Sequence, residues 1–162
     1  MILDVARQVS RIMARRHIRG AVIGGIAVVL HGHVRTTKDV DVFAPEPIDD
    51  LADALRAGRF EFDRRRREFV KSGVPVHLVT LEQLGREPRS IVEIDHVATV
   101  SLADLIDMKL RSGLSNPLRA QDLADVIGLI RHHRLRTTFA AALDRSVRTE
   151  FRKLAKAVRE QG

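Results

Sequence analysis

The stretch AVIGGIA at residues 21–27, followed by RTTKDVDVF at residues 35–43, decides the expected fold of this chain. One apolar run precedes the paired glycines and another follows them, which is typical of a strand, a tight turn and a helix. In the later segment, Asp39 and Asp41 alternate with apolar residues in the period-2 pattern of a strand, so both carboxylates point to one face. The two segments predict a strand, a turn, a helix and a second strand with an acidic face.

The two aspartates are spaced to share a hard cation, because the usual strand rise places them about 7 Å apart on one face. Mg²⁺ prefers oxygen ligands and is commonly held by one or two carboxylates together with substrate phosphates. Gly24 and Gly25 form a turn without Cβ atoms, where backbone N–H groups and the positive end of the next helix can approach a phosphate. Either motif alone also fits an ordinary turn or a solvated strand. Their order favours a site for a triphosphate and a metal.

This arrangement resembles the nucleotidyltransferase superfamily, with its DNA polymerase β-like fold, in which a Gly-Gly or Gly-Ser turn precedes an Asp-x-Asp strand. The stretch RTTKDVD at residues 35–41 is most similar to the nucleotidyltransferase-like toxins of type IV toxin–antitoxin pairs. A second region supports that branch: SLADLIDMK at residues 101–109 and RAQDLAD at residues 119–125 resemble its Lys-bearing helix and its Arg-x-x-Asp-x-x-Asp helix. The matches span roughly residues 20–130.

The resemblance implies transfer of a nucleotidyl group from a nucleoside triphosphate to an acceptor hydroxyl. Asp39 and Asp41 would hold Mg²⁺ or Mn²⁺, and Gly24 and Gly25 would bind the phosphates. The acceptor that this branch implies is the 3′ end of a transfer RNA, with an antitoxin protein as a further partner. A protein hydroxyl is an alternative acceptor.

Other candidate site residues come from the same resemblance. Lys109 would contact the phosphates and stabilise charge on the leaving pyrophosphate, and Asp122 would lie in the catalytic site and orient Lys109 or Arg119. Arg35 and Lys38, just before the aspartate strand, are candidate nucleotide contacts. Without the resemblance, Lys109 fits a solvated helix position and the acidic helix fits a surface ion-pair ladder.

One departure from the family pattern concerns catalysis. Family enzymes usually carry a third carboxylate on a later strand, and the best-matching strand, VPVHLV at residues 74–79, has His77 at that place. An imidazole suits zinc, copper, iron or nickel better than magnesium. His77 is therefore a candidate general base, or else a replacement in a site that no longer turns over. Asp63 is a weaker substitute for the lost carboxylate.

Length and composition predict one domain over residues 1–162. The alternation of expected strands and helices predicts an α/β (α+β) class with a mixed twisted sheet flanked by helices, and the resemblance implies that this is the nucleotidyltransferase fold. Its nucleotidyltransferase core is expected at about 20–100 and a helical C-terminal part at about 101–160. The sequence has no cysteine, which excludes disulfides and thiolate metal sites and permits a cytoplasmic location. No apolar run approaches the roughly 20 residues needed to span a bilayer, so no membrane partner is expected.

A net charge of +7 favours a polyanionic partner. Residues 131–162 contain nine Lys or Arg and three acidic residues, and RRRR at residues 64–67 is a second basic cluster. The candidate nucleic-acid contacts recur at helical spacing: Arg145, Arg148, Arg152, Lys156 and Arg159. Because Trp and Tyr are absent, backbone recognition of a structured RNA fits better than base stacking. Solvated faces, or a contact for an acidic protein, are the alternatives.

Periodicity predicts the remaining elements. Strands are expected near 21–23, 39–43, 60–69, 74–79 and 91–94, and helices at 1–19, from 25, near 48–57, 101–113, 116–133 and 138–159. The 116–133 helix would begin with Asn116 as N-cap and Pro117 in the first turn. Two other function classes are open: a noncatalytic protein that binds nucleic acid or a protein partner, and an aminoglycoside-type transferase acting on a small-molecule hydroxyl.

Overall fold

The chain forms two compact units in a computed structural model, which describes residues 1–116 and 119–161. Unit 1 comprises Met1–Leu30 and Arg35–Ser101, and unit 2 comprises His31–Val34 and Leu102–Gly162. The expectation that both complete a single domain stays a prediction. In the described part of the chain, no helix has the length and apolar character needed to cross a membrane.

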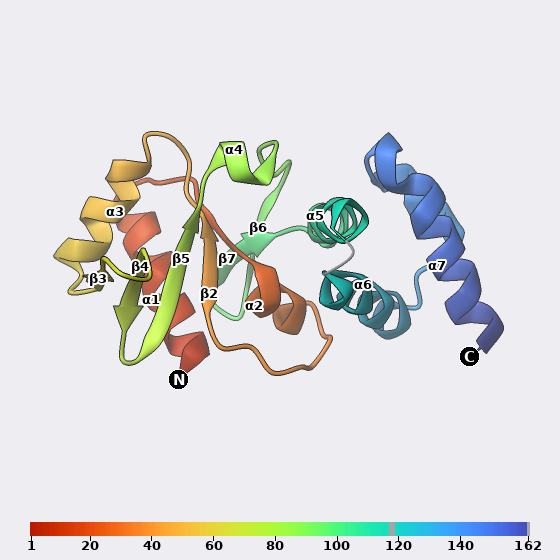
Figure 1. The fold of residues 1–162 in the computed structure, drawn as a ribbon, viewed down its shortest axis with the longest axis horizontal. Helices are drawn as coiled ribbons and strands as arrows, with labels where there is room; N and C mark the ends of the chain where they lie inside the picture. Colours follow the sequence, from red (N-terminus) through yellow and green to blue (C-terminus); the bar gives the residue numbers. More distant parts are fainter. Residues whose placement is uncertain (117–118, 162) are drawn as a thin grey trace. The chain divides into compact units, whose positions relative to one another are not determined.

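Unit 1 is built on a seven-stranded sheet with the order β3-β4-β5-β2-β1-β7-β6 (Figure 1). The strands are β1 (Ala21–Ile23), β2 (Val40–Phe43), β3 (Glu61–Asp63), β4 (Glu68–Lys71), β5 (Val74–Val79), β6 (Ile91–Ile94) and β7 (Val97–Val100). The sheet is mixed, because β2 pairs with β5 and β1 with β7 in parallel, whereas the other neighbours are antiparallel. Its helices are α1 (Ile2–Arg15), α2 (Gly24–Leu30), α3 (Ile48–Ala57) and α4 (Leu81–Leu84).

The alternation along the central strands separates the core from the candidate site. Val40 and Val42 of β2 are fully buried in the same apolar cluster as Val9 of α1 and Leu51 of α3. Side chains alternate across a strand, so Asp41, between the two valines, lies on the opposite face of the sheet. One face therefore packs against helices, while the other presents the acidic residues.

The strand predicted over residues 60–69 is wrong in one respect, because the segment forms a β-hairpin. β3 pairs with β4, and the four arginines at 64–67 form the exposed turn between them. The Asp63 carboxylate accepts hydrogen bonds from the backbone N–H groups of Arg65 and Arg66, at 2.9 and 3.2 Å. Four adjacent cations are more easily solvated in a turn than in a sheet, and the Asp63 side chain closes that turn.

Unit 2 consists of helical segments: α5 (Leu102–Ser115), α6 (Ala120–His133), the 3₁₀ turns η1 (Thr137–Ala142) and η2 (Arg145–Val147), and α7 (Arg148–Gln161). The helix expected over 138–159 begins only at Arg148. The segment before it is held in 3₁₀ turns, because the Asp144 side chain accepts a hydrogen bond from Ser146 N–H and Asp144 N–H donates to Asp107. The helix expected from 116 begins at Ala120, and Pro117 lies outside the described residues.

Two glycines of unit 2 leave room for histidine rings. A Cβ atom added at Gly128 of α6 would collide with the ring of His33, and one added at Gly32 would collide with the ring of His132. His133 also contacts this segment, because its Nε2 lies 2.6 Å from the carbonyl oxygen of His31. The 31–34 segment and the end of α6 therefore fit each other through reciprocal glycine–histidine contacts.

Replacing Gly128 with alanine is expected to destabilise the protein by about 1 kcal/mol or more, because the overpacked His33 ring must move. In an ordinary helix the same change stabilises by about 1 kcal/mol. Chemical denaturation of Gly128→Ala in the wild-type and His33→Ala backgrounds checks the cause. The alanine should be harmless or stabilising once the ring is gone, and a stabilising effect in the wild-type background would contradict the packing.

Candidate active site

The paired glycines lie directly against the segment that carries the aspartates. Gly24 has a φ of +67°, which favours glycine, and a Cβ atom there would collide with the Asp41 carboxylate. A Cβ atom at Gly25 would lie 2.7 Å from the Thr37 hydroxyl oxygen and 3.0 Å from a guanidinium nitrogen of Arg35. The turn thus packs so closely against Asp41 and Arg35 that a side chain at either glycine would collide with the neighbouring side chains.

Asp39, Asp41 and His77 form an acidic–imidazole cluster on the open face of the sheet. In the parallel β2–β5 pairing, Asp41 lies opposite His77. The His77 Nδ1 atom is 3.2 Å from Asp41 Oδ1 and 3.6 Å from Asp39 Oδ2. One ligand atom from each residue lies within 4.8 Å of the others, and the three side chains are 32–40% exposed. The cluster can hold a cation and remain accessible to a substrate.

Glu68 is the acidic residue that the sequence did not single out. Its Oε2 atom lies 2.5 Å from His77 Nε2, and its side chain is only 8% exposed. β4 runs antiparallel to β5 with Phe69 opposite Val76, so Glu68 comes next to His77 one residue further along the pairing. A hairpin interpretation of residues 60–79 would have revealed this neighbour, because it would have placed Glu68 and His77 on adjacent strands.

The ring of His77 is thus placed between carboxylates. Burial lowers the pKa of His77, but hydrogen bonds to Glu68 and Asp41 and the negative charges of Asp41 and Asp39 outweigh it, so the pKa is raised above its ordinary value of 6.5. When the ring is protonated in the metal-free protein, each of its nitrogens can donate a hydrogen bond to a carboxylate.

The raised pKa gives a pH-dependent contribution to folding in the metal-free protein. A histidine that binds its proton more tightly when folded stabilises the fold fully below about pH 6.5, and this stabilisation is lost as the pH rises through the folded-state pKa. NMR titration of the His77 ring protons should give a pKa above 6.5, and Glu68→Gln should lower it. A wild-type pKa at or below 6.5 would show that the carboxylates do not govern this ring.

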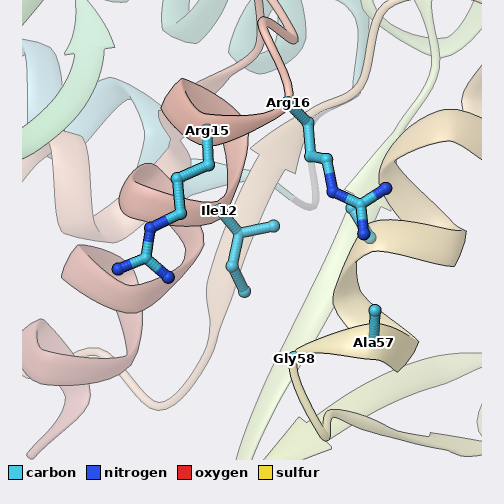
Figure 2. A pocket seen from close by; sticks show the side chains of 6 residues that line it. Ile12, Arg15, Arg16, Ala57 and Gly58 are labelled. Atoms are coloured by element: carbon cyan, nitrogen blue, oxygen red, sulfur yellow. The ribbon is translucent and has the colours of Figure 1, made fainter.

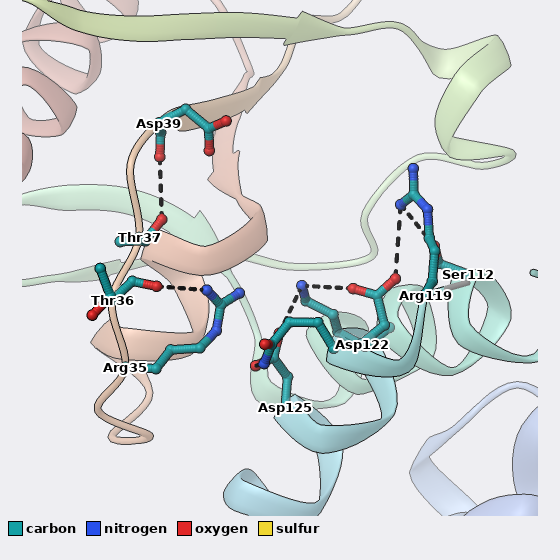
Figure 3. A network of polar contacts seen from close by, with 10 residues as sticks. Arg35, Thr36, Thr37, Asp39, Ser112, Arg119, Asp122 and Asp125 are labelled. Carbon is teal, nitrogen blue, oxygen red and sulfur yellow. Dashed lines mark hydrogen bonds and ion pairs between the residues drawn. The ribbon is translucent and has the colours of Figure 1, made fainter. Parts of the chain in front are cut away.

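The residues before the aspartate strand are bound to their own backbone (Figure 3). The Arg35 guanidinium donates to the Thr36 carbonyl at 2.9 Å, and the Thr37 hydroxyl donates to the Asp39 carbonyl at 3.4 Å. Lys38 is exposed. Arg35 lies beside the Gly25 turn, whereas contacts of Arg35 and Lys38 with a nucleotide stay predictions.

Lys109 of unit 2 is buried and paired with two acids of α6. Its Nζ atom lies 3.0 Å from Asp122 Oδ1 and 3.0 Å from Asp125 Oδ2. Arg119 lies 3.7 Å from the other Asp122 oxygen and donates to the Ser112 hydroxyl, as Figure 3 shows. Asp122 does contact both Lys109 and Arg119, but the expected role of Lys109 at a phosphate stays a prediction.

The five basic candidates near the C-terminus do not share one helix. Arg152, Lys156 and Arg159 are exposed on α7, whereas Arg145 belongs to η2. Arg148 is half-buried, and its guanidinium donates to the carbonyls of Leu143 and Ala141 at 2.9 and 3.4 Å. Arg148 therefore stabilises the turn before α7, which leaves the other residues as the exposed basic set of this segment.

A shallow pocket lies between α1 and α3, away from the acidic face (Figure 2). It is lined by Ile12, Arg15, Arg16, Ala54, Ala57 and Gly58. The guanidinium groups of Arg15 and Arg16 extend in different directions in Figure 2, so they do not converge on one anion. The pocket is not part of the Asp39–Asp41–His77 cluster.

The sheet and the C-terminal helices recur in solved nucleotidyltransferase-like proteins. An antigenic nucleotidyltransferase-like protein from Paracoccidioides brasiliensis superposes with a TM-score of 0.57 and 18% identity, over 79% of this chain and 74% of that one. ANT(2″)-Ia, solved in complex with adenylyl-2″-tobramycin, superposes with a TM-score of 0.60 and 14% identity, over 98% of this chain and 97% of that one. At these identities the likeness shows the fold, and it confirms the predicted fold class.

The sequence itself gives the family. No curated protein matches the chain. Residues 1–155 match the family described as "Nucleotidyltransferase of unknown function (DUF6036)", and this match includes the glycine turn, the aspartate strand and His77. The chain belongs to this nucleotidyltransferase family.

Proposed function

We propose that the protein is a metal-dependent nucleotidyltransferase that uses a nucleoside triphosphate and an acceptor hydroxyl. The observation that carries this proposal is the convergence of the Gly24 turn, Asp39, Asp41 and His77 on one open face of the sheet. Family membership supports the class of reaction.

The donor set fits a divalent cation. Two carboxylates and an imidazole meet with their ligand atoms within 4.8 Å of one another, and we assign the metal to Asp39, Asp41 and His77. A bound divalent cation would neutralise phosphate charge and lower the pKa of the attacking hydroxyl.

The residues of the chain then have separate tasks. We assign the phosphates to backbone N–H groups of the Gly24–Gly25 turn, which the absence of Cβ atoms allows to lie directly against Asp41 and Arg35. Arg35, whose guanidinium lies beside Gly25, provides a fixed positive charge for them. In the reaction, the acceptor oxygen bonds to the α-phosphorus and the bond from this phosphorus to the pyrophosphate oxygen breaks. Pyrophosphate leaves, and the hydroxyl proton passes to solvent at the exposed edge of the cluster.

The acceptor that we propose is RNA, and specifically the 3′ end of a transfer RNA. The exposed cations of α7 (Arg152, Lys156 and Arg159) and of the 64–67 turn support a polyanionic acceptor. The resemblance of residues 35–41, 101–109 and 119–125 to the type IV toxins supports transfer RNA and, as a regulatory partner, an antitoxin. The full-length likeness to ANT(2″)-Ia makes a small-molecule hydroxyl the second acceptor to test.

The test is transfer of label from each α-labelled nucleoside triphosphate, with Mg²⁺ or Mn²⁺, to total transfer RNA or to tobramycin. Wild-type protein and a Glu61→Gln control, changed at an exposed β3 residue, should label RNA, whereas the Asp39→Ala/Asp41→Ala variant should not. Label on tobramycin alone would replace RNA by a small-molecule acceptor, and label on the protein would indicate protein nucleotidylation. Absence of label from every acceptor would favour a noncatalytic protein.

A further inference from the structure

His77 differs from the aspartates in that both of its ring nitrogens are already directed by acidic residues. Nδ1 faces Asp41 and Asp39, at 3.2 and 3.6 Å, and Nε2 faces Glu68 at 2.5 Å. His77 lies on β5, between Glu68 on β4 and Asp41 on β2, with Asp39 just before β2, so the sheet itself fixes the ring between these carboxylates. A flip of the imidazole ring would replace both nitrogens by carbons at these positions, so the contacts of both nitrogens would be lost.

Glu68 has a different environment from the two aspartates. Its side chain is 8% exposed, against 40% for Asp39 and 32% for Asp41. A buried carboxylate is costly unless it is hydrogen-bonded, and the His77 Nε2–H group satisfies it. Because Glu68 accepts at Nε2, it favours the tautomer with the proton at Nε2, in which the Nδ1 lone pair is available to a cation held by the two aspartates.

A carboxylate that accepts from the far nitrogen of a histidine is a common support for a histidine metal ligand, because it fixes the tautomer and makes the ligating nitrogen more basic. We propose that Glu68 is a positioning residue that makes His77 a metal ligand through Nδ1, and that the site consequently selects a first-row transition cation over Mg²⁺.

The selectivity follows from the donor set. Magnesium prefers oxygen ligands. An imidazole nitrogen binds the divalent ions of the first transition row, such as Co²⁺ and Zn²⁺, more tightly than it binds Mg²⁺. With His77 in place of a third carboxylate, the site gains one nitrogen donor and loses one negative charge. The lost charge weakens the binding of any divalent cation, whereas the nitrogen donor raises affinity for Co²⁺ or Zn²⁺ relative to Mg²⁺. This inference rests on the proposed metal site, but it concerns which ion occupies the site and not whether transfer occurs.

The test is Co²⁺ binding to the metal-free protein, followed by visible absorption, with Mg²⁺ affinity measured by competition. Wild type should bind Co²⁺ more tightly than Mg²⁺. Glu68→Gln, which keeps the side-chain shape, should weaken Co²⁺ binding about tenfold or more and change Mg²⁺ binding far less. His77→Asp should alter the Co²⁺ spectrum and shift the preference toward Mg²⁺, and the Glu61→Gln control should behave as wild type.

A second readout identifies the ligating atom directly. The ¹⁵N spectrum of the Zn²⁺-loaded protein should show His77 with metal at Nδ1 and a proton at Nε2. Thermal unfolding of each metal-free variant separates loss of binding from loss of fold. Unchanged Co²⁺ affinity in both Glu68→Gln and His77→Asp, equal losses for Co²⁺ and Mg²⁺ in Glu68→Gln, or metal at Nε2 would each overturn the inference. If the metal results hold and no acceptor is labelled, only the proposed transfer reaction fails.

Discussion

Replacing Asp41 with asparagine is expected to abolish divalent-cation binding at the site and to reduce nucleotidyl transfer by about 10³-fold or more, equivalent to roughly 4 kcal/mol of transition-state stabilisation. Asp41 is the carboxylate closest to both the Gly24 turn and His77 Nδ1. Asparagine keeps the side-chain shape but removes the negative charge that a cation requires. Steady-state transfer rates and calorimetric metal titration measure the two losses.

The matched control for Asp41→Asn is Glu61→Gln, which also removes one negative charge from the sheet but at an exposed position on β3. Its metal affinity and rate should equal those of the wild type. Melting temperatures of both variants show whether the fold is intact. A correctly folded Asp41→Asn protein that still transferred nucleotide at the wild-type rate would exclude the assigned site.

Replacing Lys109 with methionine is expected to destabilise the protein by about 3–5 kcal/mol, the usual cost of removing one partner from a buried ion pair. Lys109 is 8% exposed, and the change would remove the buried cation that lies 3.0 Å from both the Asp122 and the Asp125 carboxylates. Urea denaturation measures the loss. Lys153→Met is the control, because Lys153 forms an exposed pair with Glu150 that is worth a fraction of a kcal/mol.

The triple variant Lys109→Met, Asp122→Asn, Asp125→Asn separates stability from function. Neutralising both acids should recover much of the stability lost in Lys109→Met, because no uncompensated charge stays buried. If Lys109 also contacts the nucleotide, as the family resemblance implies, the triple variant should transfer the nucleotidyl group more slowly than the wild type even though its stability is restored. A single Lys109→Met variant as stable as the wild type would contradict the buried pairing.

The sequence predicted the strands and turn of residues 21–43 because two strong local signals coincide there. Gly24 requires a positive φ, and Asp39 and Asp41 alternate with apolar residues at the strand period. Both signals depend only on residues close in the sequence, so these elements could be predicted without knowing how the strands pair in the sheet. The same holds for β5, which was predicted with its observed bounds, 74–79.

Residues whose role depends on distant neighbours were not predicted. Glu68 follows four arginines and has no local pattern of its own, and its contact with His77 arises only when β3 and β4 form a hairpin. The 3₁₀ turns before α7 were missed because helical spacing of basic residues does not reveal that Asp144 holds the chain in a turn. Sequence spacing therefore placed Asp39 and Asp41 on one face of a strand but did not reveal that Glu68 lies beside His77.

Nucleotidyl transfer to RNA is tested most directly by the mass of transfer RNA after incubation with protein, nucleoside triphosphate and divalent cation, with pyrophosphate measured in the same reaction. We predict a mass increase of whole nucleoside monophosphate units and one pyrophosphate released per unit, with wild type and not with the Asp39→Ala/Asp41→Ala variant. An unchanged RNA mass with no pyrophosphate release, or equal products from the double variant, would contradict a nucleotidyl transfer to RNA that depends on these two aspartates.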